Sequence, residues 1–207
     1  SKQNKNNKPS KKEIIVKAFK FHSQGNFKEA KKYYEYFINQ GFHDHRVFSN
    51  YGVILRDLGK LKEAEFAILK AIKLKPEYPQ AHLNLGGILR DLGKLKEAEL
   101  ATHKAIELNP KCSNAYRDLG ICLYLLKDFK SAIKSIIKAN SLDTKNIINK
   151  LLFSIFKTEE KKREQINYID NFKKKNLVSN TLIFNLPVDE KLINTLYQLE
   201  SQDQEIY

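Results

Sequence analysis

The sequence predicts an all-α protein, a solenoid of stacked antiparallel helix pairs, because one pattern returns along it at a fixed period. The stretch ILRDLGKLKEAE at 54–65 recurs letter for letter at 88–99, so the offset between the two copies is 34. Small residues keep the same step along the chain: Ala30, Ala64, Ala98 and Ala132, and Gly52, Gly86 and Gly120. A fixed period of this length is typical of helical repeats that bury their apolar faces against their neighbours.

Each repeat is predicted to hold two helices joined by a short turn. The repeated glycine lies mid-way along the first helix, where a large side chain would hold the second helix away. The repeated alanine faces it from the second helix, and residues such as Leu55 and Ile68 fill the space between them. The turn glycines at 25, 59 and 93 suit a left-handed helix cap, and the prolines at 76 and 110 stop the second helix.

The chain begins with residues 1–10, which are mostly Asn and Lys and carry too little apolar surface to order themselves. We interpret them as a basic tail in solvent; an arm that contacts nucleic acid is the alternative. The first unit, 11–44, departs from the pattern, because Phe19 and Phe21 enlarge its first helix and FHDH replaces the closing proline.

The units 45–78 and 79–112 follow the pattern most closely. The fourth unit, 113–146, keeps Gly120 and Ala132 but has Lys127 in place of the turn glycine and Thr144 in place of the closing proline. We therefore predict four units over residues 11–146.

Beyond residue 146 the signature fades while helical periodicity continues. Six apolar residues form a stripe at helical spacing: Ile147, Ile148, Leu151, Leu152, Ile155 and Phe156. We predict a helical cap over 147–176, which covers the last unit and turns a polar face outward. Residues 177–207 are predicted to form an extended connector and a helix from 188 to 199, the start of a possible further domain.

Motifs of catalysis are absent from the sequence. There is no glycine-rich phosphate loop, nucleophile elbow or HExxH metal motif. His43 and His45 are the only close histidine pair and lack a supporting Cys/His set, and Cys112 and Cys122 suggest no disulfide framework. We expect no cofactor, no metal and no enzyme activity within this chain.

The cellular setting is predicted to be the cytoplasm, with the protein monomeric in isolation. No apolar run approaches the ~20 residues of a membrane span, and the lysine-rich start has no apolar signal region. The sequence has no methionine, so Ser1 is not a translation start and the polypeptide is a processed, engineered or partial chain.

A binding surface is what the repeats offer. In a stack of helix pairs the first helices line the concave side, and their exposed positions recur at helical spacing. In the first helices of the second, third and fourth units these candidate groove residues are Arg46, Ser49, Asn50, Val53, Arg56 and Asp57, then Gln80, Leu83, Asn84, Gly87, Arg90 and Asp91, then Arg117, Asp118, Ile121 and Tyr124.

With these motifs the chain resembles a tetratricopeptide-repeat (TPR) protein over about residues 11–146, of the bacterial type with near-identical consecutive repeats. The resemblance implies a right-handed superhelix whose groove binds peptide segments of partner proteins. Asn50 and Asn84 resemble the asparagines with which long family members hold a peptide backbone. The chaperone-binding members use a Lys/Asn/Arg clamp for a terminal carboxylate, but Val16 and Phe19 stand where part of that clamp is expected.

Nucleic acid is the weaker hypothesis for the partner. The net charge is +13, but the excess lysines cluster at the start and at 173–175 rather than in the groove. Aromatic residues interleaved with arginines, which single-strand binding requires, are absent from the central units. Two functions remain: a module that binds a peptide of a partner protein, or the recruiting part of a transferase-like or oxygenase-like enzyme whose catalytic domain lies beyond residue 207. The sequence after residue 207 discriminates between them.

Overall fold

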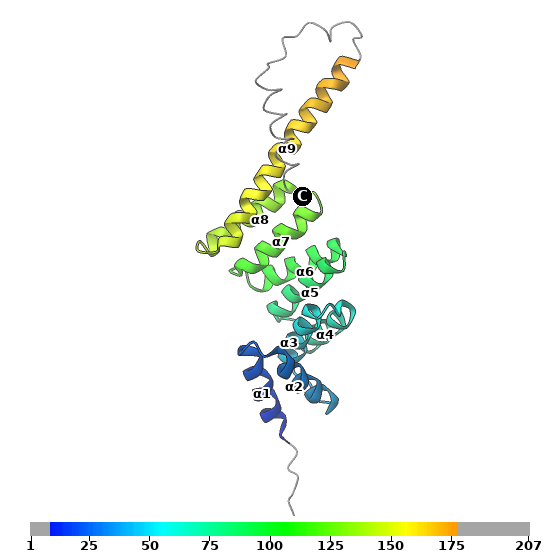
Figure 1. The fold of residues 1–207 in the computed structure, drawn as a ribbon, viewed down its shortest axis with the longest axis vertical. Helices are drawn as coiled ribbons and strands as arrows, with labels where there is room; N and C mark the ends of the chain where they lie inside the picture. Colours follow the sequence, from blue (N-terminus) through cyan, green and yellow to red (C-terminus); the bar gives the residue numbers. More distant parts are fainter. Residues whose placement is uncertain (1–8, 178–207) are drawn as a thin grey trace, which may run out of the picture. The chain divides into compact units, whose positions relative to one another are not determined.

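The computed structural model describes residues 9–177, with side chains described to residue 168, and every regular element in that part is an α-helix. In order (Figure 1) the helices are α1 Lys11–Ser23, α2 Phe27–Asn39, α3 His45–Asp57, α4 Leu61–Leu74, α5 Pro79–Asp91, α6 Leu95–Leu108, α7 Ser113–Leu125, α8 Phe129–Leu142 and α9 Ile147–Leu177. The predicted all-α fold is confirmed. The tail at 1–8 and the segment at 178–207 lie outside the described residues.

The first eight helices form four antiparallel pairs, α1 with α2 through α7 with α8, as predicted. Their first helices begin at residues 11, 45, 79 and 113, and α9 begins one further repeat period on, at residue 147. Consecutive first helices touch one another, α3 with α5 and α5 with α7, and each second helix also packs on the next first helix. Contacts divide the chain after Glu160, and all four pairs belong to the first unit.

The repeated glycines permit the close approach within each pair. A Cβ built on Gly52 would lie 2.7 Å from Ile68 Cδ1, and one on Gly120 would lie 2.9 Å from Ile136 Cδ1. In a close-packed interior neither contact is tolerable unless the isoleucine or its whole helix shifts. As expected from the sequence, a larger side chain at Gly52 or Gly120 would hold the second helix of the pair away from the first.

The turns inside the pairs use a left-handed residue just past the first helix. Gly25, Gly59 and Gly93 have φ values of +71°, +74° and +76°. In the fourth unit Lys127 takes the same conformation with φ +68°, although its Cβ disfavours it. The geometry of the repeat thus prevails over the local preference of the residue.

Helix ends follow the capping chemistry of the sequence. Ser10 and Glu13 form a capping box at the start of α1, in which the Ser10 N–H donates to the Glu13 carboxylate at 2.7 Å. The side chain of Asp44 caps α3, and Pro79 begins α5. The helix α8 ends at Leu142 without a proline, and the N–H of its C-cap residue Asp143 donates to the Ala139 carbonyl.

The apolar stripe of α9 differs from the expected cap. Phe156 is buried against α7 and α8, and Leu152 and Phe153 pack beside it. Ile148, Leu151 and Ile155, however, are 56%, 59% and 42% exposed. The side of the helix that should have been polar therefore carries large aliphatic side chains.

Candidate functional site

The site is built on the side of the stack where consecutive first helices meet, here called the first-helix face. It comprises the exposed positions of α3, α5 and α7. Because α3 contacts α5 and α5 contacts α7, residues on this face can interact with a neighbouring unit. The predicted groove residues all belong to these three helices.

Two asparagines bridge neighbouring units on this face. Asn50 Nδ2 donates to Tyr34 Oη of α2 at 3.3 Å, and Asn84 Nδ2 donates to Ser49 Oγ of α3 at 3.1 Å. Gln80 Nε2 donates to Asn84 Oδ1 at 2.9 Å. Both asparagines are half-buried rather than fully exposed. Each uses one N–H of its amide in the bridge and has a second N–H to offer a ligand. The oxygen of Asn84 already accepts from Gln80, which leaves it one lone pair.

The support for Asn50 reaches into the first unit. Tyr34 is fully buried, and its Oη lies 3.1 Å from His22 Nδ1. Burial raises the pKa of Tyr34 to about 12, and burial also lowers the pKa of His22. The phenol therefore stays neutral at physiological pH and acts as a fixed hydrogen-bonding partner for Asn50.

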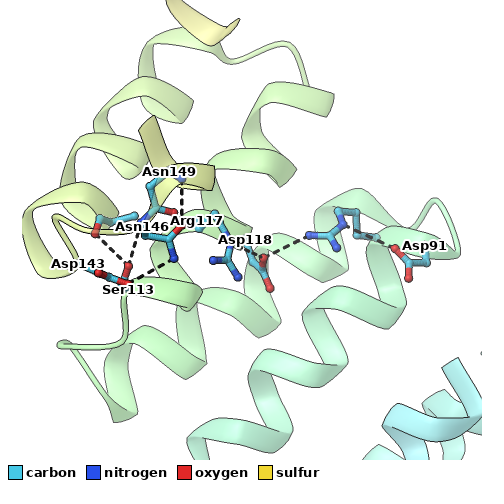
Figure 2. A network of polar contacts seen from close by, with 9 residues as sticks. Asp91, Ser113, Arg117, Asp118, Asp143, Asn146 and Asn149 are labelled. Carbon is cyan, nitrogen blue, oxygen red and sulfur yellow. Dashed lines mark hydrogen bonds and ion pairs between the residues drawn. The ribbon is translucent and has the colours of Figure 1, made fainter. Parts of the chain in front are cut away.

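Arginines and aspartates form a ladder across the three helices. Arg56 Nε donates to Asp91 Oδ2 at 2.5 Å, which joins α3 to α5. Arg90 lies 3.7 Å from Asp91 and 3.7 Å from Asp118, which joins α5 to α7. Figure 2 shows this part of the ladder with Arg117, whose Nε lies 3.9 Å from Asp118. The positive charge of the face is thus largely compensated within the protein.

Asp118 occupies the position that carries Asn50 and Asn84 in the preceding units. Burial raises the pKa of its carboxyl group, and the attraction of Arg90 and Arg117 offsets that rise only in part. The two arginines approach it at long ion-pair distances, so they have capacity for stronger charge-assisted hydrogen bonds with a ligand.

Three predicted groove residues are not exposed, which corrects the sequence interpretation. Ser49, Leu83 and Gly87 are buried. Ser49 supports Asn84 instead of facing a ligand. A Cβ on Gly87 would lie 2.9 Å from Arg56 Nη1, so this glycine leaves room for the guanidinium that reaches Asp91.

The remaining predicted residues are accessible to different degrees. Arg46 is exposed, but its guanidinium pairs with Asp44 at 2.8 Å and lies 5.3 Å from the centre of the Phe19 ring. Three further positions are exposed, Asp57, Gln80 and Asp91, and Val53, Ile121 and Tyr124 are half-buried. The arginine nearest the first unit is therefore held by its own helix cap.

The sequence interpretation assigned the aliphatic residues of α9 to a cap and missed that some of them stand at groove positions. Ile148, Leu151, Leu152 and Ile155 stand one repeat period after Asn114, Arg117, Asp118 and Ile121 of α7. Extending the repeat by one more step would have placed them at groove positions. The weak repeat signature after residue 146 concealed this.

A cavity is lined by residues that are not among the predicted groove residues. It has a volume of about 430 Å³ and is lined mainly by apolar side chains of α2, α3 and α4, among them Ile38, Phe48 and Leu55. Phe66 at its edge is 71% exposed. This feature offers an apolar contact surface separate from the asparagines and the charge ladder.

Two other classes of site are not found in the described part of the chain. Across residues 9–177 no helix has the length and apolarity needed to cross a membrane. Within the same range, no three His, Cys, Asp or Glu residues are grouped so as to hold a metal ion.

Comparisons with known proteins agree with the observed repeats. Residues 45–78 and residues 79–112 each match the tetratricopeptide repeat family. MamA 41-end from Desulfovibrio magneticus RS-1 is similar in structure, with a TM-score of 0.65 and 18% identity over 83% of this chain and 97% of that chain. No curated protein matches the chain.

Two further solved structures have the same fold. YrrB, described as a TPR protein with an unusual peptide-binding site, has a TM-score of 0.60 and 20% identity over 68% of this chain and 72% of its own. The first TPR of Spaghetti (RPAP3), bound to the HSP90 peptide SRMEEVD, has a TM-score of 0.54 and 22% identity over 56% of this chain and 91% of its own. At these identities the likeness shows the fold.

Proposed function

This chain is a tetratricopeptide-repeat protein, and we propose that it binds an extended peptide segment of a partner protein along the first-helix face. The observation that carries the proposal is the pair of bridging asparagines, Asn50 and Asn84, at equivalent positions of consecutive units. Their fixed amides suit the alternating donors and acceptors of a peptide backbone.

The spacing of the repeats fits an extended chain. Packed helices lie about 10 Å apart, and an extended peptide advances about 3.3 Å per residue. Consecutive units therefore meet the peptide at about every third residue. Backbone recognition at this interval tolerates many side chains, so we expect affinities in the micromolar range, about 8 kcal/mol.

The charge ladder makes the preference for acidic peptides mild. A carboxylate of the ligand has to compete with Asp91 and Asp118 for the arginines that these residues already contact. The long contacts of Arg90 and Arg117 are the ones that a ligand can shorten. Replacing Arg56 and Arg90 by Glu is expected to reverse the preference.

Two structural neighbours support the proposal in general terms. YrrB is described as having a peptide-binding site, and the Spaghetti repeat is bound to a peptide. These proteins show that the fold accommodates peptides, and the chemistry of this chain's own face determines which peptides it accepts.

The test is selection of peptides from a random dodecapeptide library displayed on phage, with the full chain as target. Selected peptides are synthesised and titrated against wild type and against a variant with Asn50→Ala and Asn84→Ala. We expect the double variant to lose at least tenfold in affinity. The Asn39→Ala variant, which alters an exposed asparagine at the end of α2, is the matched control and should bind like wild type.

The stability of the double variant also has to be measured. Each asparagine donates a half-buried hydrogen bond to the preceding unit, and such a bond contributes about 1 kcal/mol. We therefore expect a measurable loss in the free energy of unfolding with retained helicity. If the folded double variant bound peptides as tightly as wild type, the first-helix face would not be the binding surface, and the cavity beside Phe66 would be tested next.

A further inference from the structure

The first part of α9 occupies the place of a fifth first helix. It starts one repeat period after α7, and residues equivalent to buried positions of α7 are buried again: Asn149 corresponds to Ala115, and Phe156 to Cys122. The Phe156 ring stacks on Tyr124 of α7, with 4.5 Å between the ring centres. Residues 147–160 therefore continue the stack, and they belong to the same compact unit as the four helix pairs.

The outward side of this helix carries an aliphatic stripe, defined as Ile148, Leu151 and Ile155. These side chains are 56%, 59% and 42% exposed. A helix that only closes a solenoid is expected to present a polar side to water, because exposed aliphatic clusters promote association. The stripe thus has a surface property that capping does not explain.

The stripe continues the line of groove positions on the first-helix face. Leu151 stands one repeat period after Arg117, and Ile155 stands one period after Ile121. Ile121 and Tyr124 are themselves half-buried and belong to the same apolar cluster as Leu152 and Phe156. Groove positions on α3, α5 and α7 therefore carry mostly amide and charged side chains, whereas the corresponding positions on α9 carry aliphatic ones.

We propose that the stripe is the specificity-determining end of the peptide site and takes a large aliphatic or aromatic side chain of the partner peptide. This inference rests on the peptide-binding function proposed above. The same peptide presents an acidic side chain to Arg117, which lies one repeat earlier. With helices about 10 Å apart and about 3.3 Å per residue of extended peptide, the acidic and apolar residues are three positions apart.

The charged residues next to the stripe favour a peptide that carries an acidic side chain as well as the apolar one. Arg90 and Arg117 flank Asp118 at 3.7 Å and 3.9 Å, and the ionised form of this carboxylate is disfavoured by burial; Arg90 also lies 3.7 Å from Asp91. The end of the face that adjoins the stripe is therefore complementary to a negative group. A purely apolar partner would leave Arg90 and Arg117 with only their long contacts to Asp91 and Asp118, whereas a carboxylate on the partner would add charge-assisted hydrogen bonds.

The experiment is the same phage selection, run in parallel on the full-length wild type, a Leu151→Ser/Ile155→Ser variant and an Arg117→Gln variant. The Leu100→Ser variant is the matched control, because Leu100 is a 71% exposed leucine on α6. Thermal melting followed by circular dichroism checks that each variant is folded, and light scattering measures its mass.

On wild type and on Leu100→Ser we expect enrichment of peptides with Asp or Glu three residues from Leu, Ile, Phe or Tyr. The Leu151→Ser/Ile155→Ser variant should lose the apolar enrichment, keep the acidic one and bind the wild-type peptides at least tenfold more weakly. The Arg117→Gln variant should lose the acidic enrichment and keep the apolar one.

Other outcomes overturn the inference in separable ways. No enrichment on any target, wild type included, overturns peptide binding itself. Equal apolar enrichment on wild type and on the Leu151→Ser/Ile155→Ser variant overturns the role of the stripe and leaves peptide binding intact. A wild-type dimer that becomes monomeric in this variant assigns the stripe to a second copy of the chain. Tighter peptide binding by the variant assigns it to another segment of the same chain, and both results overturn the proposal.

Discussion

Arg56 of α3 and Asp91 of α5 form an ion pair between consecutive helix pairs, with 2.5 Å between Nε and Oδ2. The two residues are 35 positions apart, and Arg56 reaches across Gly87 to make the contact. The pairing fixes a guanidinium on the first-helix face. It also places its charge beside a carboxylate, so the face is less basic than its arginines suggest.

The first prediction concerns this pair. Asp91→Asn should lower the free energy of unfolding by at most about 1 kcal/mol, because ion pairs open to solvent contribute little. It should also strengthen binding of glutamate-containing peptides, because Arg56 and Arg90 lose a competing carboxylate. Urea denaturation and fluorescence anisotropy at two salt concentrations measure the two effects. Asp57→Asn, which changes the equivalent residue one unit earlier, is the control; equal effects in both variants would contradict the cross-unit pairing.

The second prediction concerns the turn of the fourth unit. Lys127 has φ +68°, a conformation that suits glycine and costs other residues about 1 kcal/mol. Lys127→Gly should therefore raise the free energy of unfolding by about 0.5–1 kcal/mol, since the glycine's larger freedom in the unfolded chain offsets part of the gain. Lys127→Ala, which keeps the Cβ, should give no such gain. A destabilised glycine variant in urea denaturation would refute the argument.

Much of the fold could be predicted from the sequence because each helix pair is specified locally. The glycine and alanine steps, the turn residues and the helix starts all follow the repeat period, and the contacts at Gly52 and Gly120 have the predicted physical cause. The conformation of Lys127 also follows from the period once the repeat geometry is assumed to persist. Repetition allows one unit to predict the next.

The site could be predicted only in outline, because its interactions run between units. The sequence places Asn84 on the correct helix but does not indicate that Ser49 of α3 is its partner. Similarly, the order of residues suggests that Arg56 and Arg90 are each neutralised by the aspartate that follows them. Arg90 does contact Asp91, but Arg56 pairs with Asp91 of the next unit rather than with Asp57. The exposure of Leu151 was not predicted either, because the fading signature suggested a cap, although one more step of the repeat places this residue at a groove position. Such contacts depend on how neighbouring units are stacked.

The last prediction uses Asp118, which interrupts the asparagine row. Because burial raises the pKa of its carboxyl group, its ionised form is disfavoured in the folded protein relative to the unfolded chain. The stability associated with protonated Asp118 is therefore present at low pH and is lost as the pH rises through the folded-state pKa. Asp118→Asn supplies the residue of the two preceding units, which stays uncharged at every pH.

We expect Asp118→Asn to be more stable than wild type at pH 7 and to lose that advantage as the pH approaches and falls below the ordinary aspartate value of 3.8. Urea denaturation at pH 7, 5 and 4 measures the difference. Asp143→Asn, an aspartate outside the ladder that accepts from Asn146 at 3.3 Å, is the comparison. The Asp118→Asn variant should also bind acidic peptides more tightly, because Arg90 and Arg117 no longer share a carboxylate. A variant that is less stable than wild type at pH 7 would show that the attraction of the arginines outweighs burial, and the ladder would then be a stabilising feature of the free protein.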